Sequence, residues 1–392
     1  MNNSVMKNKK TSSFLPYLLI SLLLLLTSCS KLEKANTVQP GSEKQEEDVY
    51  KIAVAAPQFG PYQELGLSIV RGAELAVELK NKNGGINGKQ IKLINVDDGG
   101  LSGEAIWKAK SLVQEKVIGV IGHLNSDISI PASEIYSMAM IIEISPGSTS
   151  PLFTERDSVK NYVFRTIGRD DAQGKISAQY ALEKGFKKIA VLHNDRSYGL
   201  SLSSEFVKKI DASMQQVEII HKEAYKVGNE DFSKQISVLK EKSPDLIFFA
   251  GEYGDAASFL NQMKKTGLNI PFLGGEGVFD QEFILLAKSA SEGAYVISSP
   301  VITDNNFIKT YKEKFKKELG SYSANSFDAT NILISAIESV KDKNPEKIAK
   351  AVGQTKEFPG LTGKLTFDSK GDLLEPKFSI YQVKNGMFVV LQ

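Results

Sequence analysis

Short apolar runs alternate with amphipathic stretches along most of this chain, and this alternation restricts the fold more than any other feature of the sequence. The run at residues 52–56 is followed by residues 68–80, whose apolar side chains recur at helical spacing. Asn83, Gly84 and Gly85 then end the helical stretch, as glycine does after a last helical turn. Because parallel strands must be joined by a crossover, the repeated pattern predicts an α/β protein with parallel sheets.

The apolar runs form two series, and each series is long enough for a sheet of its own. The 392-residue chain has room for two domains, and helical stretches between the runs would cover both faces of each sheet. We therefore expect two doubly wound, three-layer αβα domains. The runs are residues 52–56, 91–96, 117–121 and 141–144 in the first series, and residues 189–192, 217–220, 246–249 and 271–273 in the second.

The last two apolar segments differ from the others because only a short turn separates them. Residues 378–383 and 387–391 flank Asn385 and Gly386, and Asn-Gly between two such runs is a strong signal for a hairpin turn. The sequence therefore predicts an antiparallel hairpin at the C-terminus.

The N-terminus has the pattern of an export signal. Three lysines within residues 7–10 precede an apolar run at residues 14–26, which is shorter than the roughly 20 residues that a spanning helix needs. The run ends in residues 26–29, Leu-Thr-Ser-Cys, which resembles the lipobox of bacterial lipoproteins. A lone cysteine is otherwise a small buried apolar residue. The position of Cys29 favours residues 1–28 as a signal peptide and Cys29 as a lipidated first residue.

The segment after Cys29 is polar, and residues 29–49 are predicted to be a flexible tether between a lipid anchor and the folded body. Cys29 is the only cysteine, so no intramolecular disulfide stabilises that body. The net charge of +2 falls to −1 when the three lysines of the leader are removed. This balance shows no bias toward nucleic acid.

Several motifs, in their order and spacing, resemble the Leu/Ile/Val-binding proteins of branched-chain amino-acid ABC transporters. The motifs are residues 72–77 with 84–88, residues 96–98, residues 120–124 with 131–136, residues 145–149, residues 231–233 with 239–240 and 244–245, and residues 274–278. The resemblance extends from about Lys51 to about Leu373. It implies the type I periplasmic binding protein fold, in which a three-segment hinge joins two lobes.

The resemblance also implies a domain division and a function. The N-terminal lobe would comprise residues 50–167 and 298–375, and the C-terminal lobe residues 168–297 and 376–392. The expected function is binding of a small, branched-chain or aliphatic amino acid by hinge closure, outside the cytoplasm, and its delivery to the permease subunits of an ABC importer. No catalysis, cofactor or metal is expected.

A free amino acid carries a carboxylate and an ammonium, so its receptor needs hydrogen-bond donors on one side and negatively charged acceptors on the other. Ser126 and Asp127 stand at the start of a predicted helix, where free N–H groups suit a carboxylate. As a plain helix cap, Ser126 would instead contribute about 1 kcal/mol to helix stability. By the resemblance, Ser126 and Thr149 bind the carboxylate, and Gly147 offers its carbonyl to the ammonium.

From the second lobe, the resemblance implies that Tyr198 and Glu276 close on the ligand, with Glu276 as the charge partner of the ammonium. The family's second cleft aromatic aligns ambiguously with Glu252 or Tyr253, and we prefer Tyr253. The chain departs from the family after Pro61, where Tyr62 is displaced and Leu65 stands in place of an aromatic lid residue. The identity of the side-chain pocket therefore stays open.

Other classes of protein are disfavoured. An exported hydrolase would need a nucleophile, a base and an orienting group, but no G-x-S-x-G motif is present and the three histidines show no such pairing. Three scattered histidines also lack metal-ligand spacing. The glycine-rich segments match no phosphate-binding motif. Within the binding class, a sensory receptor, or a receptor for an amide, urea or aromatic acid, stays an alternative.

Overall fold

The computed structural model describes residues 48–391, and its first sheet contains five parallel strands in the order β2-β1-β3-β4-β5. The predicted signal peptide, Cys29 and nearly all of the predicted tether lie outside the described residues. The strands are β1 (Tyr50–Ala56), β2 (Ile91–Asp97), β3 (Gly119–Gly122), β4 (Ile142–Ser145) and β5 (Val163–Arg165).

The second sheet contains seven strands in the order β14-β13-β10-β9-β8-β6-β7. Its five parallel strands repeat the order of the first sheet, with β6 and β8 in the places of β1 and β3. The strands are β6 (Lys188–Asn194), β7 (Glu218–Tyr225), β8 (Leu246–Ala250), β9 (Phe272–Gly274), β10 (Tyr295–Ser298), β13 (Ser379–Lys384) and β14 (Met387–Val390).

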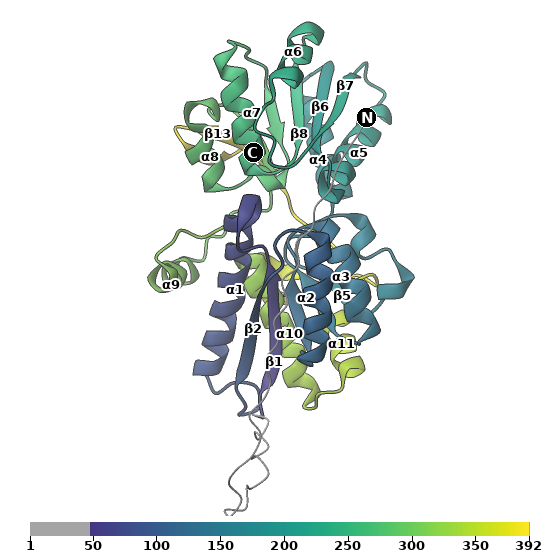
Figure 1. Cartoon of the computed structure of the whole chain (residues 1–392), viewed down its shortest axis with the longest axis vertical. Helices are drawn as coiled ribbons and strands as arrows, with labels where there is room; N and C mark the ends of the chain where they lie inside the picture. Colours follow the sequence, from purple (N-terminus) through teal and green to yellow (C-terminus); the bar gives the residue numbers. More distant parts are fainter. Residues whose placement is uncertain (1–47, 392) are drawn as a thin grey trace, which may run out of the picture. The chain divides into compact units, whose positions relative to one another are not determined.

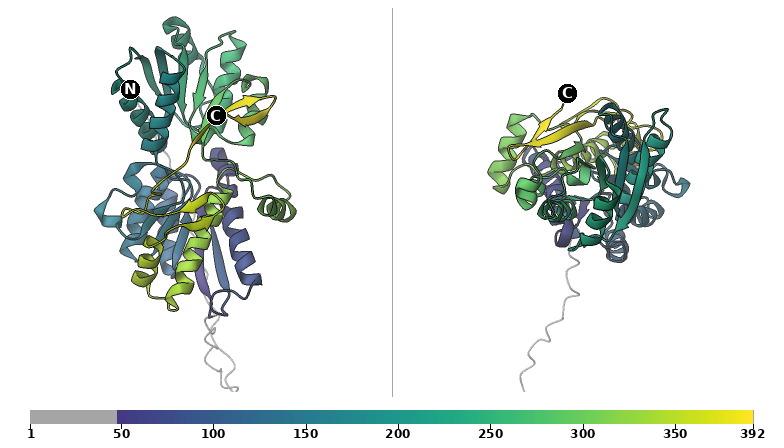
Figure 2. Two further views of the ribbon diagram at one scale, coloured as in Figure 1. Left: turned by 180° about the vertical axis from the view of Figure 1, so that it is seen from behind. Right: turned by 90° about the horizontal axis from the view of Figure 1, so that it is seen from above.

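The predicted C-terminal hairpin is confirmed, because β13 and β14 pair antiparallel with Lys384 opposite Met387. Asn385 and Gly386 both have positive φ, 52° and 70°, as a two-residue hairpin turn requires. Figure 2 shows this hairpin, drawn in yellow, at the edge of the second sheet, where β13 pairs antiparallel with β10.

Helices lie on both faces of each sheet (Figure 1), and the two buried clusters that contain β1 residues illustrate this arrangement. Ile52 and Val54 share a buried cluster with α1 and α10, whereas Ala53 and Ala55 share another with α2 and α3. Both faces of the strand are thus buried, as in a parallel sheet between two helical layers. The helices around the first sheet are α1 (Gln63–Lys82), α2 (Ser102–Gln114), α3 (Ser126–Met138), α10 (Ser323–Val340) and α11 (Pro345–Gly353).

The second sheet is enclosed in the same way. Leu192 and Phe249 pack with α6, α7 and α8 on one face, and Val191 and Phe248 pack with α4 and α5 on the other. These helices are α4 (Asp170–Glu183), α5 (Ser197–Asp211), α6 (Ser233–Lys242), α7 (Tyr253–Lys265) and α8 (Gln281–Ala287). The remaining α-helix is α9 (Asn305–Phe315), and the remaining strands are β11 (Phe358–Gly360) and β12 (Gly363–Leu365).

The chain passes between the two sheets three times. It leaves the first sheet after β5, returns after β10 to form α9, α10 and α11, and leaves again after β12 to form β13 (Figure 1). The predicted fold class, two three-layer α/β lobes joined by three segments, is therefore confirmed. The residue limits given above for the two lobes stay a prediction.

The strand order locates the place where a ligand is expected. In open parallel sheets, ligands bind beyond the carboxyl ends of the strands at the point where the strand order reverses. In this protein that point lies between β1 and β3 in one sheet and between β6 and β8 in the other. Within residues 48–391, no helix has the length and apolar character needed to cross a membrane.

Candidate ligand-binding site

One cavity is lined by loops from the carboxyl ends of strands in both sheets. Its interior measures about 20 Å³, room for roughly one water molecule, and its total hollow, including the opening to solvent, is about 340 Å³. An amino acid therefore requires its walls to move apart. The lining residues are Leu65, Leu124, Asn125, Ser126, Gly147, Thr149, Tyr198, Glu252, Glu276, Gly277 and Tyr322.

Unpartnered buried polar atoms distinguish this cavity from larger hollows. Asn125 Oδ1, Thr149 Oγ1 and Glu276 Oε2 are buried and have no hydrogen-bond partner. Four hollows of about 1010 to 1320 Å³ elsewhere on the described part of the chain have no such atom among their lining residues. Because burying a polar group without a partner costs free energy, these atoms indicate a ligand.

The start of α3 presents donors to the cavity. Ser126 is the first residue of α3, and the first N–H groups of a helix have no partner inside it. The Ser126 hydroxyl accepts a hydrogen bond from the backbone N–H of Ser150 at 3.2 Å, so its own hydrogen is free for an acceptor. The Ser126 side chain therefore fastens the 147–150 loop beside the helix terminus.

The 147–150 loop follows β4 and is held from behind by a buried arginine. Arg165 Nη1 donates to the Ser148 carbonyl at 2.8 Å, and Nη2 donates to the Ser150 carbonyl at 3.0 Å. The guanidinium is paired with Asp372, with Nε 2.6 Å from Oδ1. Both carbonyls flank Thr149, so Arg165 holds the backbone that would present the Thr149 N–H group and hydroxyl to a ligand.

The opposite wall comes from the second sheet. Tyr198, in the first turn of α5, accepts a hydrogen bond from the Gly277 N–H at 3.1 Å. Gln173 Oε1 accepts from the Glu276 N–H at 2.9 Å. These contacts hold the Tyr198 side chain against the loop after β9, which contains Glu276.

Glu276 is a buried acid with one free oxygen. Its Oε1 accepts from the Ser299 N–H at 3.3 Å and from the Ser299 hydroxyl at 3.0 Å, whereas Oε2 has no partner. Burial raises the pKa of Glu276 to about 7, although the hydrogen bonds from Ser299 lower it. A cation beside Oε2 would favour the ionised form.

Asp170 is a further buried acid next to Thr149. Its backbone N–H donates to the Thr149 carbonyl at 2.9 Å, and neither carboxylate oxygen makes a well-formed hydrogen bond. Burial raises the pKa of Asp170 to about 7, and the nearby hydroxyls of Thr149 and Ser201 lower it by less. The region around the cavity is thus rich in acceptors.

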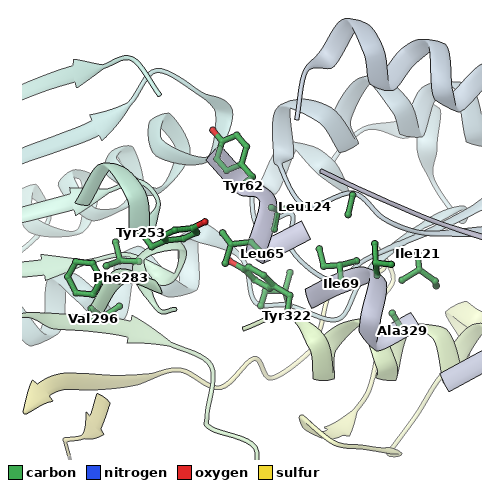
Figure 3. Close-up of a cluster of buried hydrophobic side chains, with 14 of the residues drawn as sticks. Tyr62, Leu65, Ile69, Ile121, Leu124, Tyr253, Phe283, Val296, Tyr322 and Ala329 are labelled. Atoms are coloured by element: carbon green, nitrogen blue, oxygen red, sulfur yellow. The ribbon is translucent and has the colours of Figure 1, made fainter. Parts of the chain in front are cut away.

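Glu252 lines the cavity, and Tyr253 does not. Glu252 lies two residues after the end of β8, and its Oε2 accepts a hydrogen bond from Asn194 Nδ2 at 2.7 Å. Tyr253 is the first residue of α7, and Figure 3 shows its ring beside Leu65 within the buried cluster. The other five predicted site residues all line the cavity.

The apolar part of the wall comes from α1 and from the start of α10. Leu65, which stands in place of the family's aromatic lid residue, lines the cavity together with Leu124 and Tyr322. Figure 3 shows these three side chains. Tyr62 is buried beside these residues but does not line the cavity.

Five lining residues were not anticipated as ligand contacts. Asn125 was detectable in principle, because it precedes the predicted start of α3. Gly277 directly follows the anticipated Glu276. Leu124 and Tyr322 had no sequence signal, since buried apolar residues of this kind are abundant in any core. Glu252 was one of two residues that align with the family's second cleft aromatic, and Tyr253 was preferred.

The three histidines lie outside the cavity lining. His123 is buried, with Nδ1 2.6 Å from Asp98 Oδ2 and Nε2 3.2 Å from the Tyr136 hydroxyl. His193 contacts the Asn194 carbonyl, and His221 contacts Glu223. Within residues 48–391, no group of three histidine, cysteine or acidic side chains is arranged to hold a metal ion.

Comparisons with known proteins agree with this geometry. A protein of Brucella abortus (strain 2308) named Leu/Ile/Val-binding protein homolog 1 is 34% identical over 342 residues, which cover 86% of this chain and 90% of the relative. The leucine-, isoleucine-, valine-, threonine-, and alanine-binding protein of Pseudomonas aeruginosa is 32% identical over 340 residues, with 86% and 90% coverage.

A solved structure shares the fold as well. The branched-chain amino acid transporter substrate binding protein of Streptococcus pneumoniae, in complex with isoleucine, superposes with a TM-score of 0.80 at 27% identity. The match covers 88% of this chain and 99% of that protein. The sequence profile of the periplasmic binding protein family matches residues 49–387. This chain therefore belongs to the periplasmic binding protein family, among the substrate-binding proteins of branched-chain amino-acid ABC transporters.

Proposed function

We propose that this protein binds a small amino acid between its two lobes and delivers it to the permease subunits of an ABC importer. The observation that supports this most strongly is the opposition of two kinds of group across one cavity. On one side lie the α3 terminus, Ser126 and Thr149, which suit a carboxylate. On the other side Glu276 offers a free, buried carboxylate oxygen to an ammonium.

The named specificities of the relatives support the same ligand class. The Brucella relative is named for binding leucine, isoleucine and valine, the Pseudomonas relative is named for these together with threonine and alanine, and the Streptococcus structure holds isoleucine. Leu65, Leu124 and Tyr322 give the cavity of this chain an apolar wall.

A thermal-shift screen of the purified protein tests the ligand class. The screen includes the twenty amino acids, their deaminated analogues, simple amides, urea and aromatic acids. A ligand present at 100 times its dissociation constant should stabilise the protein by roughly 2.7 kcal/mol. Stabilisation by one or a few amino acids is expected. Stabilisation by an amide, urea or an aromatic acid, with none by any amino acid, would overturn the proposal.

We also propose that the protein is exported and anchored to the bacterial cell membrane, on its extracytoplasmic or periplasmic face, by lipid on Cys29. The support is the apolar run at residues 14–26 followed by Leu-Thr-Ser-Cys. Two or more acyl chains on Cys29 would give stable membrane attachment, whereas a single chain would not. Mass spectrometry of the membrane fraction should find an acylated peptide that begins at Cys29. An unmodified Cys29 in a protein cleaved elsewhere would contradict the anchor.

A further inference from the structure

Glu252 is a second buried carboxylate in the cavity, and recognition of an amino acid's backbone does not account for it. The residue is 7% exposed and lines the cavity. One oxygen, Oε2, accepts a hydrogen bond from Asn194 Nδ2 at 2.7 Å. A single amide donor leaves most of the acceptor capacity of a carboxylate unused.

The two carboxylates of the cavity face different surroundings. Around Glu276, the groups that influence its pKa most after burial are Ser299 and Asp170. Around Glu252, the corresponding groups are Asp255, Asn194 and Asp127. The two carboxylates also belong to different loops, after β8 and after β9, so Glu252 is available to a part of the ligand other than the ammonium that Glu276 would hold.

Glu252 has no cationic neighbour among the residues that line the cavity. The residues that line the cavity include no lysine, arginine or histidine. Arg196, which lies near this side, is paired with Asp127 at 3.0 Å. Burial, reinforced by Asp255, raises the pKa of Glu252 to about 8, as expected of a carboxyl group that lacks a positive partner.

Among the residues that line the cavity, the buried atoms without a hydrogen-bond partner are acceptors or hydroxyl groups: Asn125 Oδ1, Thr149 Oγ1 and Glu276 Oε2. A wholly aliphatic amino acid brings only its ammonium as a donor. If such a side chain packed against Glu252, it would exclude water from the carboxyl group and supply no hydrogen-bond donor in place of that water, which costs free energy.

We propose that the ligand is an amino acid whose side chain carries a hydrogen-bond donor, and that Glu252 accepts this donor and determines the specificity of the site. The inference rests on the proposed function, because it assumes that an amino acid occupies the cavity. The donor is an ammonium, an amide or a hydroxyl group, all of which share this chemistry.

Calorimetry with isosteric pairs tests the inference on the purified protein. The pairs are 2,4-diaminobutyrate with norvaline, asparagine with leucine, and threonine with valine, in which a donor replaces a methyl group of similar size. In at least one pair, the donor-bearing member should bind at least tenfold more tightly than its apolar partner. The three pairs also distinguish an ammonium, an amide and a hydroxyl group as the donor.

Glu252→Met, which has a similar length and no charge, should reduce or reverse this preference. The exposed Glu241 on α6 provides the matched control, and Glu241→Gln should keep the preference of the parent protein. Circular dichroism of each variant verifies folding. If Glu252→Met does not fold, Glu252→Gln replaces it. The ratio of the two dissociation constants in each pair, measured on the parent protein, still tests the inference.

Tighter binding of the apolar member in every pair, or an unchanged preference in Glu252→Met, would overturn this inference and leave the proposed function intact. A complete lack of binding by amino acids, in parent and variants alike, would overturn the proposed function and this inference together.

Discussion

Glu276 has two hydrogen bonds from Ser299 on one carboxylate oxygen and none on the other. The residue is therefore held in place by the protein, while its free oxygen is available to a ligand. Thr149 shows the same arrangement, with its carbonyl bonded to the Asp170 N–H and its hydroxyl unpartnered. At the scale of single residues, both residues are held by hydrogen bonds to one polar atom and keep another polar atom available to a ligand.

Replacement of Glu276 by glutamine tests its assignment as the ammonium partner. Glu276→Gln keeps the shape of the side chain and removes its charge, and a hydrogen bond to a charged group contributes about 1.5–3 kcal/mol. We expect amino-acid affinity to fall about tenfold or more, measured by calorimetry. The corresponding deaminated acid, which has no ammonium, should lose far less. Equal affinity of parent and variant for the amino acid would contradict the assignment.

The buried acids also predict how stability depends on pH. Burial raises the pKa values of Glu276 and Asp170 to about 7 and that of Glu252 to about 8, above their ordinary values near 4. At pH values between the ordinary and the raised pKa, these carboxyl groups are protonated in the folded protein and ionised in the unfolded chain. The free energy of unfolding should therefore fall as pH rises from about 5 to about 8.

Thermal unfolding of the ligand-free protein across this pH range measures the effect. The midpoint should fall with rising pH, and the fall should be smaller in Glu276→Gln, which has no proton to lose at this position. The exposed Glu241→Gln variant should follow the parent protein. A midpoint in Glu276→Gln that falls as steeply as in the parent would show that Glu276 does not titrate in this range.

At the scale of elements, the site depends on short loops that follow the carboxyl ends of strands. Ser126 follows β3, Thr149 follows β4, Glu252 follows β8 and Glu276 follows β9. These loops approach one another closely, and glycine makes the approach feasible where a side chain would collide. At Gly275, a Cβ atom would lie 2.5 Å from the Tyr198 hydroxyl oxygen and 2.6 Å from Leu202 Cδ2.

Gly275→Ala should therefore destabilise the fold and displace Tyr198. Overpacking of this kind costs about 1–3 kcal/mol, and the ligand should bind more weakly because Tyr198 lines the cavity. Gly254→Ala in α7 is the matched control, because no atom lies within 4 Å of its added Cβ. Urea unfolding should show a loss of stability only in Gly275→Ala. Equal stability of the two variants would contradict this account of the β9 loop.

At the scale of the whole molecule, the structure joins two sheets of the same parallel strand order by three segments. Residues of both sheets line the cavity, and its interior of about 20 Å³ is too small for an amino acid to enter as it stands. A ligand that touches both lobes favours the arrangement in which both surround it. The three connecting segments are the natural place for such a motion.

Small-angle X-ray scattering of the protein, with and without an identified ligand, tests hinge closure. The radius of gyration should decrease on binding, because the lobes of the ligand-free protein are free to open, whereas a ligand that contacts both lobes holds them together. The same ligand concentration should leave the scattering of Glu276→Gln less changed, since that variant binds more weakly. An unchanged radius of gyration in the parent protein at saturation would leave the closure hypothesis unsupported.

The sequence by itself determined the layered α/β class, because strand and helix periodicities and the Asn385-Gly386 turn depend on local backbone and side-chain preferences. The resemblance to the Leu/Ile/Val-binding proteins, carried by sequence motifs, indicated Ser126, Gly147, Thr149, Tyr198 and Glu276, which the structure brings to one cavity.

Only the tertiary structure decided between Glu252 and Tyr253, placed Leu65, Leu124 and Tyr322 in the wall, and set Arg165 behind the 147–150 loop. Adjacent residues at a strand end point in different directions, and which one meets the cavity depends on how the following helix packs. The long-range contacts that define the wall join segments as distant as Leu65 and Tyr322, and no local pattern in the sequence encodes them.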